Sequence, residues 1–332
     1  MRTSILLRKR RKKFQIEQQV QSVFDEWLSH LLTEDFLHDD TFVTPEWLLP
    51  GPKNRIARQY AINQLISTKK NLIGLAGRNI VWLYEKMGLK ADSMTKFRSP
   101  VWHVKAWGIY ELYMMDQEDM QAAIARHTNH RNAYVRMEAQ TAVLAFAGFE
   151  GLNFLDTLTR PMNDWQQLKL IEQLTPLDPG DLAHLNIWLN AGNPDVALFA
   201  LKLAGLYQQM QVADDVIMLL KDHREKLREQ AIKTLVRVGD ESSLSILIQR
   251  YAVETPVNRT TILKSLESMA TDKELPFLLT LLEQGDPDIQ LQAVRIMMKC
   301  CSNGGALVQE RSIETGDTFG RLYLHIKSEM AR

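Results

Sequence analysis

Few residues of this chain combine a reactive type with a spacing that chemistry could use. His127 and His130 lie three residues apart and could hold a metal ion together with a third ligand. The same His-Thr-Asn-His segment fits a polar loop between helices, which is the interpretation we favour. Cys300 and Cys301 have no histidine nearby in the sequence, so a structural role fits them better than a reactive thiol. We therefore predict no metal site.

The motifs of the common enzyme classes are missing from the sequence. It contains no phosphate-binding glycine loop, no Gly-x-Ser-x-Gly segment and no paired cysteine motif for zinc. Two adjacent cysteines cannot build a disulfide framework, and this favours a reducing, cytoplasmic compartment. The sequence predicts a protein without catalytic residues or a cofactor that binds another macromolecule.

Basic residues recur at a constant interval of 31 in the second half of the chain, at Lys202, Lys233, Lys264 and Arg295. Apolar residues occupy neighbouring offsets, at Leu198, Leu291 and Met298. Such a column of cations beside apolar side chains would suit an acidic segment of a protein partner. Lysine is also common on solvated helix faces, so a surface without a partner is the alternative.

Near the N-terminus, an Ile-Leu-Leu segment leads into six consecutive basic residues, Arg8, Lys9, Arg10, Arg11, Lys12 and Lys13. This boundary is typical of the cytoplasmic flank of a transmembrane helix, here one that would lie upstream, or of a segment that binds an anionic membrane surface. A solvated tail and a nuclear-localisation or nucleic-acid-binding patch are the alternatives. No apolar stretch of about 18 residues or more occurs in the sequence itself.

The composition indicates a folded protein with an uneven charge. The chain has 332 residues, of which 45% are apolar and 24% charged, and its length suits two domains or a repeat array. The formal net charge is zero, but residues 1–13 hold seven basic residues and no acid, which leaves −7 for the rest. This acidic body disfavours general nucleic-acid binding.

The cations belong to a repeat of 31 residues. Each lies six residues after a mostly apolar residue that we call the lead position, and the residues four, five, eight and eleven after it are mostly apolar. At about 100° per residue these offsets share one face of a helix, and the cation points away from it. The lead positions, with one residue of slippage, are Val104, Val135, Trp165, Val196, Leu227, Asn258 and Ile289. The Trp165 repeat departs most, because Lys169 stands where a small residue is expected.

A second apolar series precedes the lead positions at the same interval. It comprises Phe154, Leu185, Val216, Leu247 and Leu278 and, four residues after each, Leu158, Leu189, Leu220, Tyr251 and Leu282. Asn-Pro, Thr-Pro and Asp-Pro pairs at 193–194, 255–256 and 286–287 mark turns before a helix start. Each repeat is therefore predicted to be a helix, a turn and a helix. Pairs of this kind must stack to bury their apolar faces, which predicts an all-α solenoid.

Three segments of the repeat, 133–139, 193–200 and 286–293, resemble the second helix of HEAT repeats. The resemblance covers residues 91–301. It implies a right-handed α-α superhelix of six or seven helix pairs, with the second helices on the concave face, and a scaffold for protein partners.

The resemblance also includes two classes of HEAT-like enzymes, and the sequence lacks the features that each class needs. One HEAT-like class uses His-Glu pairs for di-iron chemistry, and the chain has no His-Glu dipeptide. Another class excises alkylated DNA bases and needs a basic surface, which the acidic body does not offer. Arg228 and Arg259 follow a lead position by one residue, where HEAT units usually place a side chain that braces neighbouring repeats.

Four segments are expected along the chain: a basic tail over 1–13, an N-terminal helical cap over 14–90, the repeat array over 91–301, and a loop with a closing helix over 302–332. The cap should contain an amphipathic helix over 14–32 that packs on the array, and two helices within 55–88. Gly304 and Gly305 predict the end of the last repeat helix and a polar loop to Asp317.

Taken together, the sequence predicts a non-catalytic, cytoplasmic scaffold held at the inner face of a membrane, which binds an acidic protein segment on its concave face. The alternative is a soluble, nucleic-acid-associated HEAT-like protein that uses the basic tail and the recurring cations against phosphates.

Overall fold

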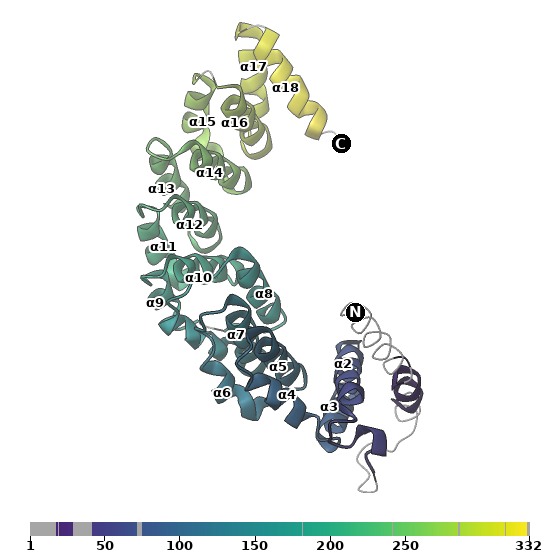
Figure 1. The fold of residues 1–332 in the computed structure, drawn as a ribbon. Coiled ribbons are helices and arrows are strands. Elements are labelled where there is room, and N and C mark those ends of the chain that lie inside the picture. Colours follow the sequence, from purple (N-terminus) through teal and green to yellow (C-terminus); the bar gives the residue numbers. More distant parts are fainter. Residues whose placement is uncertain are drawn as a thin grey trace, which may run out of the picture. The chain divides into compact units, whose positions relative to one another are not determined.

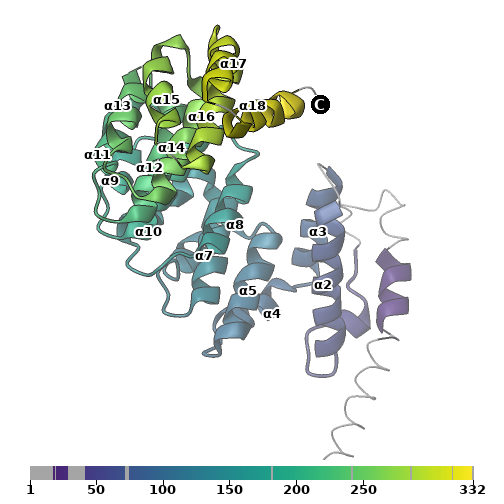
Figure 2. The same cartoon turned by 90° about the horizontal axis from the view of Figure 1, so that it is seen from above.

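The computed structural model describes residues 18, 20–28, 42–71, 75–180, 182–240, 242–284, 286–315 and 317–330. Throughout these ranges the chain forms α-helices and short 3-10 helices and no strand (Figures 1 and 2). The prediction of an all-α solenoid is confirmed. The structure divides into two compact units: unit 1 comprises residues 1–160 and 168–177, and unit 2 comprises residues 161–167 and 178–332. The domain boundaries expected from the sequence stay predictions.

Unit 1 contains a helical segment over residues 20–28, followed by two long helices within residues 55–86 and then by pairs that each combine a short first helix with a longer second one. In chain order these are η1 (Glu46–Leu48), α2 (Arg55–Asn71), α3 (Leu75–Lys86), α4 (Lys90–Phe97), α5 (Trp102–Met114), η2 (Glu118–Met120), α6 (Gln121–Ala125), α7 (Ala133–Ala147) and η3 (Gly148–Thr157). The next helix, α8 (Asp164–Leu174), begins in unit 2 and ends in unit 1.

Unit 2 continues the same alternation of a short and a long helix. Its elements are α9 (Leu185–Leu189), α10 (Pro194–Leu206), η4 (Met210–Val212), α11 (Ala213–Leu219), α12 (Glu225–Val238), α13 (Ser242–Tyr251), α14 (Pro256–Met269), η5 (Asp272–Glu274), α15 (Leu275–Leu282), α16 (Pro287–Cys300), α17 (Gly304–Thr315) and α18 (Asp317–Met330). Helices α9, α11, α13 and α15 form one layer, and α10, α12, α14 and α16 form the layer on the inner side of the curve (Figure 1).

The helix starts marked by proline are confirmed. Asn193, Thr255 and Asp286 are N-caps whose side chains accept hydrogen bonds from backbone N–H groups of the first turn, and the proline follows directly in each case. The proline has no N–H to lose there, and its fixed φ suits a first helical turn.

Burial follows the predicted period. All ten members of the series that begins with Phe154 are buried, and none exposes more than 8% of its surface. The lead residues Val135, Val196, Leu227 and Asn258 are also buried, at 2% exposure or less. The stacked helix pairs therefore bury their apolar faces against each other at these positions.

The register predicted for the Trp165 repeat was wrong by one residue. Trp165 is 64% exposed, whereas Gln166 is 3% exposed and takes the lead position 31 residues after Val135. Its partner four residues on is then Leu170, which is fully buried, and Lys169 lies on the partly exposed side. An aromatic side chain in an apolar slot looked the better match, but the buried Gln166 side chain accepts a hydrogen bond from the Asn163 N–H.

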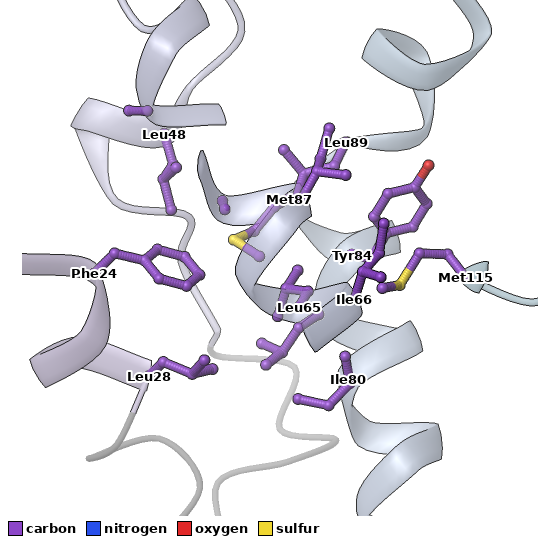
Figure 3. Close-up of a cluster of buried hydrophobic side chains, with 14 residues drawn as sticks. Phe24, Leu28, Leu48, Leu65, Ile66, Ile80, Tyr84, Met87, Leu89 and Met115 are labelled. Atoms are coloured by element: carbon purple, nitrogen blue, oxygen red, sulfur yellow. The ribbon is translucent and has the colours of Figure 1, made fainter. Parts of the chain in front are cut away.

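The described part of the expected N-terminal cap packs within unit 1, and the bounds of the cap stay a prediction. Phe24 and Leu28 of the segment 20–28 are buried against α2 and α3, in a cluster that includes Leu65 and Ile80 (Figure 3). Arg58 of α2 is 2% exposed and donates to the carbonyls of Leu48, Met87 and Gly88 and to the Asp92 carboxylate.

The polar loop expected after Gly304 is a helix instead. Helix α17 begins at Gly304 and packs on α16, and Val308 is fully buried. A Cβ atom at Gly304 would lie 1.9 Å from the Met297 carbonyl oxygen. Glycine is therefore needed here because the start of α17 lies against the backbone of α16. The closing helix predicted over 318–330 is confirmed as α18.

Candidate partner-binding surface

The recurring cations lie on the inner layer of unit 2, one on each of four stacked helices. Lys202 is on α10, Lys233 on α12, Lys264 on α14 and Arg295 on α16. Their side chains are at least partly exposed, whereas the lead residues six positions before the first three, Val196, Leu227 and Asn258, are buried. We call the surface formed by Lys202, Lys233, Arg237, Lys264 and Arg295 the inner face of unit 2.

The two ends of this column are neutralised by acids from other elements. Lys202 lies 3.2 Å from the Asp164 carboxylate at the start of α8, within unit 2. Arg295 donates to the Glu329 carboxylate of α18 at 2.7 Å. Helix α18 runs beside α16 and contacts it, so the chain itself places a carboxylate on the last cation (Figures 1 and 2).

The middle of the column is open. Lys233 pairs only with Glu229, one turn earlier on its own helix, at 2.6 Å, and its side chain stays 51% exposed. Lys264 is exposed and has no carboxylate at ion-pair distance in the described part of the chain. Exposed ion pairs of this kind contribute about 0–1 kcal/mol, so an incoming carboxylate can replace Glu229 at little cost.

Sequence reasoning missed Arg237, which is exposed on α12 one turn after Lys233. The sequence indicates Arg237 through its spacing of four residues from Lys233, which puts both cations on one side of the helix. The apolar residues predicted beside the column, Leu198, Leu291 and Met298, are half-buried and leave only part of their surface for a partner.

A polar residue one position after the lead residue ties the repeat together, except in the repeat led by Val196, which has Ala197 there. In six repeats its side chain donates to a carbonyl of the preceding helix or turn, at 2.8–3.0 Å: Lys105 to Phe97, Arg136 to His130, Gln167 to Met162, Arg228 to Asp222, Arg259 to Tyr251 and Gln290 to Leu282. These side chains fix how the second helix of a pair crosses the first.

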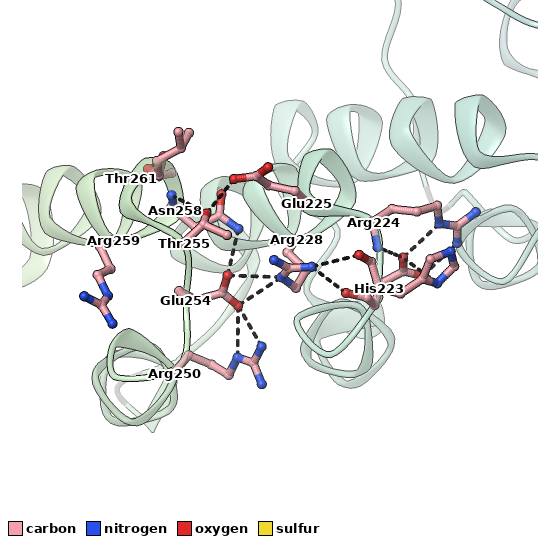
Figure 4. A network of polar contacts seen from close by, with 12 residues as sticks. His223, Arg224, Glu225, Arg228, Arg250, Glu254, Thr255, Asn258, Arg259 and Thr261 are labelled. Carbon is pink, nitrogen blue, oxygen red and sulfur yellow. Dashed lines mark hydrogen bonds and ion pairs between the residues drawn. The ribbon is translucent and has the colours of Figure 1, made fainter.

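Arg228 also reaches the following repeat through a buried carboxylate. Glu254 accepts hydrogen bonds from Arg228 at 3.0 Å, Arg250 at 2.7 Å and Asn258 at 2.9 Å (Figure 4). Burial by itself raises the pKa of Glu254, but the hydrogen bonds from Arg250, Asn258 and Arg228 outweigh burial and lower it. We call Glu254, Arg228, Arg250 and Asn258 the Glu254 cluster. Arg259 braces its own repeat and not a neighbour, since its acceptors are Tyr251 and Ala252.

Unit 1 buries a carboxylate of its own. Glu111 of α5 is fully buried and accepts hydrogen bonds from Lys96 and Ser93, both at 2.6 Å, and from Gln59 at 2.8 Å. Burial lowers the pKa of Lys96 despite this partner. Gln59 and Lys96 also line a groove of about 950 Å³ that Arg55 and Asn63 border.

The histidine pair and the cysteines occupy ordinary structural positions. His127 and His130 lie in the turn between α6 and α7, with ring centres 5.7 Å apart, and burial followed by the charge of Lys105 lowers the pKa of His127. Nowhere in the described ranges do three His, Cys, Asp or Glu side chains gather as metal ligands would. Burial raises the pKa of both Cys300 and Cys301.

The basic cluster from Arg8 to Lys13 lies outside the described residues. Among the helices that the structure describes, none has the length and apolar character to cross a membrane.

One comparison with known proteins supports the repeat. A family model described as HEAT repeats matches residues 182–267, which span α9 to most of α14. An engineered protein of known crystal structure is similar at 11% identity, over 83% of this chain and 85% of that chain, with a TM-score of 0.41. No curated protein sequence is significantly similar to this chain.

Proposed function

We propose that this HEAT-like helical repeat protein is a non-catalytic scaffold that binds an acidic segment of a partner protein on the inner face of unit 2. Proteins built from HEAT repeats generally serve as scaffolds for protein partners. The observation that carries the proposal is the pattern of pairing along the cation column. Acids from α8 and α18 neutralise its two ends, while no carboxylate of another helix lies at ion-pair distance from Lys233 or Lys264 among the residues that the structure describes.

The pair between Arg295 and Glu329 suggests the form of the partner. In this pair a helix lies against α16 and delivers a carboxylate to the column, and Ile326 of the same helix is fully buried. A partner helix with acidic residues on one side and apolar residues beside them would repeat this contact at α12 and α14. Rim charges of this kind set the rate and the specificity of association more than its affinity.

A pull-down from an extract of the native host tests the proposal. The wild type is compared with the variant Lys233→Glu/Lys264→Glu and with the control Lys221→Glu/Lys273→Glu, which makes the same charge change at exposed residues outside the column. We expect one protein, rich in acidic residues, to be retained by the wild type and by the control and lost by the Lys233 and Lys264 variant. If all three proteins have equal helical content and recover the partner equally, the inner face of unit 2 is not its binding site.

We also propose that the basic cluster from Arg8 to Lys13 holds the scaffold at an anionic membrane surface. Support comes from six consecutive cations, each contributing about 1 kcal/mol near an anionic bilayer. Sedimentation with phosphatidylserine vesicles should retain the protein, and replacing the six residues by glutamine should release it. Equal binding to vesicles of neutral lipid would contradict an electrostatic attachment.

A further inference from the structure

Two turns of unit 1 form an edge that is basic and aromatic, although the body of the protein is acidic. These turns, residues 98–103 between α4 and α5 and residues 126–134 between α6 and α7, contain no Asp or Glu. The edge presents three exposed arginines and two exposed aromatic rings, which we call the arginine–aromatic edge: Arg98, Trp102, Arg126, Arg131 and Tyr134.

The aromatic pair is a flat platform open to solvent. Trp102 begins α5 and Tyr134 lies in the first turn of α7, and their rings stack with centres 5.3 Å apart and planes 22° from parallel. Trp102 is 45% exposed and Tyr134 is 59% exposed. Rings with this degree of exposure bury little area in the fold, so their stacking leaves a ring face available to a ligand.

The two turns are held next to each other by direct contacts. The His127 ring meets Phe97, at the end of α4, edge to face at 5.4 Å, and Trp102 stacks on Tyr134. Asn129 of the second turn donates to the Thr157 carbonyl at 3.2 Å. The platform and the arginines therefore lie along one rigid border of the helix pairs.

Positive charge on this border has not been compensated by the fold. Arg98, Arg126 and Arg131 have no carboxylate at ion-pair distance within the described ranges. Burial, and then the positive charges of Lys105, Arg131 and Arg136, lower the pKa of His130 despite a hydrogen bond to Asn132 that raises it. An anion placed on the edge would relieve this repulsion.

We propose that the arginine–aromatic edge binds single-stranded nucleic acid, with a base stacked on the Trp102–Tyr134 platform and phosphates at Arg98, Arg126 and Arg131. Stacking on aromatic rings combined with cations for the backbone is the general chemistry of single-strand binding. A duplex keeps its bases inside and could use the arginines but not the rings. An acidic peptide would likewise need the arginines only, so the platform favours a single strand. The inference is independent of the inner face of unit 2.

Fluorescence anisotropy with the full chain tests this. The probes are fluorescein-labelled oligouridylate and oligothymidylate of about 15 nucleotides, near the upper end of the usual site size, and a labelled polyglutamate peptide of equal charge. The variants are Trp102→Ala/Tyr134→Ala and Arg98→Ala/Arg126→Ala/Arg131→Ala. The control is Trp107→Ala, which removes a ring that is 48% exposed on α5 and outside the edge.

We expect the nucleic acids to bind, and the loss of the platform to weaken binding on the order of tenfold, the scale of one stacked base. The arginine variant should weaken binding further and reduce the slope of log affinity against log salt by about 2, since each single-strand phosphate contributes about 0.7. The control should bind like the wild type. Circular dichroism checks that each variant keeps its helical content.

Three outcomes would overturn the proposal. The first is that neither oligonucleotide binds at low salt. The second is that binding occurs but is unchanged in the Trp102 and Tyr134 variant, which would mean that the platform is not a site. The third is that polyglutamate binds as tightly as the oligonucleotides and is insensitive to the platform, which would assign the edge to an acidic polypeptide.

Discussion

Units 1 and 2 share one repeat but show different side chains to solvent. Six residues after the lead position, unit 2 has four cations in succession, whereas α5 and α7 of unit 1 have Tyr110 and the buried Thr141. Unit 1 instead carries its cations and exposed rings in the turns before α5 and α7. The repeat restricts the buried positions and leaves the remaining ones free, so each unit has acquired a surface of its own.

The buried positions also differ where two helices approach most closely. Four residues after the lead position, α7, α10, α12 and α16 have alanine, and α5 has Gly108. A Cβ atom at Gly108 would lie 2.3 Å from the Phe97 nitrogen and 2.8 Å from the Ser93 carbonyl oxygen. Backbone atoms cannot move aside as a flexible side chain would, so α4 and α5 are in contact at a distance that only glycine allows.

The largest expected effect on stability comes from adding a methyl group where α4 and α5 are in contact. Gly108→Ala should lower the free energy of unfolding by about 3 kcal/mol, because the new methyl group forces α4 away from α5. The matched change in unit 2, Ala231→Gly, should cost about 1.5 kcal/mol, from one buried methyl group and a more flexible helix. Urea denaturation followed by circular dichroism measures both.

Two results would contradict the close approach of α4 and α5. One is a Gly108→Ala variant that is as stable as the wild type, and the other is an Ala231→Gly variant that is the less stable of the two. Gly192→Ala is a control, because a Cβ atom there meets nothing within 4 Å.

An effect of comparable size should distinguish the two buried carboxylates. Glu254 has two arginine partners and Glu111 has one lysine, whose side chain is 18% exposed and can recruit water. Glu254→Gln should destabilise by about 3 kcal/mol, the range for a broken buried ion pair, because two guanidinium groups lose their counter-charge. Glu111→Gln should cost about 1.5 kcal/mol, the scale of one charge-assisted hydrogen bond. Equal losses in thermal or urea unfolding would mean that the number of partners does not matter.

The smallest expected effect is the pH dependence of the stability that the buried Glu254 carboxylate supplies. Because the pKa of Glu254 is lowered in the folded protein, the stability that its charge supplies is complete above the unfolded value of about 4.3. It is lost as the pH falls from there through the folded pKa. The difference in unfolding free energy between wild type and Glu254→Gln should therefore shrink below about pH 4.3 and stay constant above it. A constant difference across the acid range would exclude the cluster as an acid-sensitive element.

The sequence predicted the fold well where burial depends on period alone. The series that begins with Phe154 and the proline-marked starts at Asn193, Thr255 and Asp286 needed only apolar spacing and cap residues, and both are confirmed. The Trp165 register failed because the lead slot of α8 holds a buried glutamine, which hydrophobicity cannot reveal. The helix after Gly304 was missed because two glycines lower helix propensity, while tertiary contact with α16 decides the outcome.

The candidate surface was predictable only in part. Spacing placed the four cations on one side of four helices, and the structure finds them on successive helices of unit 2. Their partners could not be predicted, because Asp164 and Glu329 lie 38 and 34 residues away in the sequence from Lys202 and Arg295. Ion pairs across such separations depend on where α8 and α18 lie in space.

The side chains that follow each lead residue have a consequence for the protein under tension. They bind carbonyls inside their own repeat, so a helix pair such as α13 and α14 behaves as a stiff link, held by Arg259 and Tyr251. Between repeats, apolar packing is joined by single polar contacts, such as those from Thr234 to the Leu201 carbonyl and from Asn190 to Asp215. A pulling force would therefore extend unit 2 like a spring whose compliance lies between the links. The joint bridged by Arg228 and Glu254 would be the last to open.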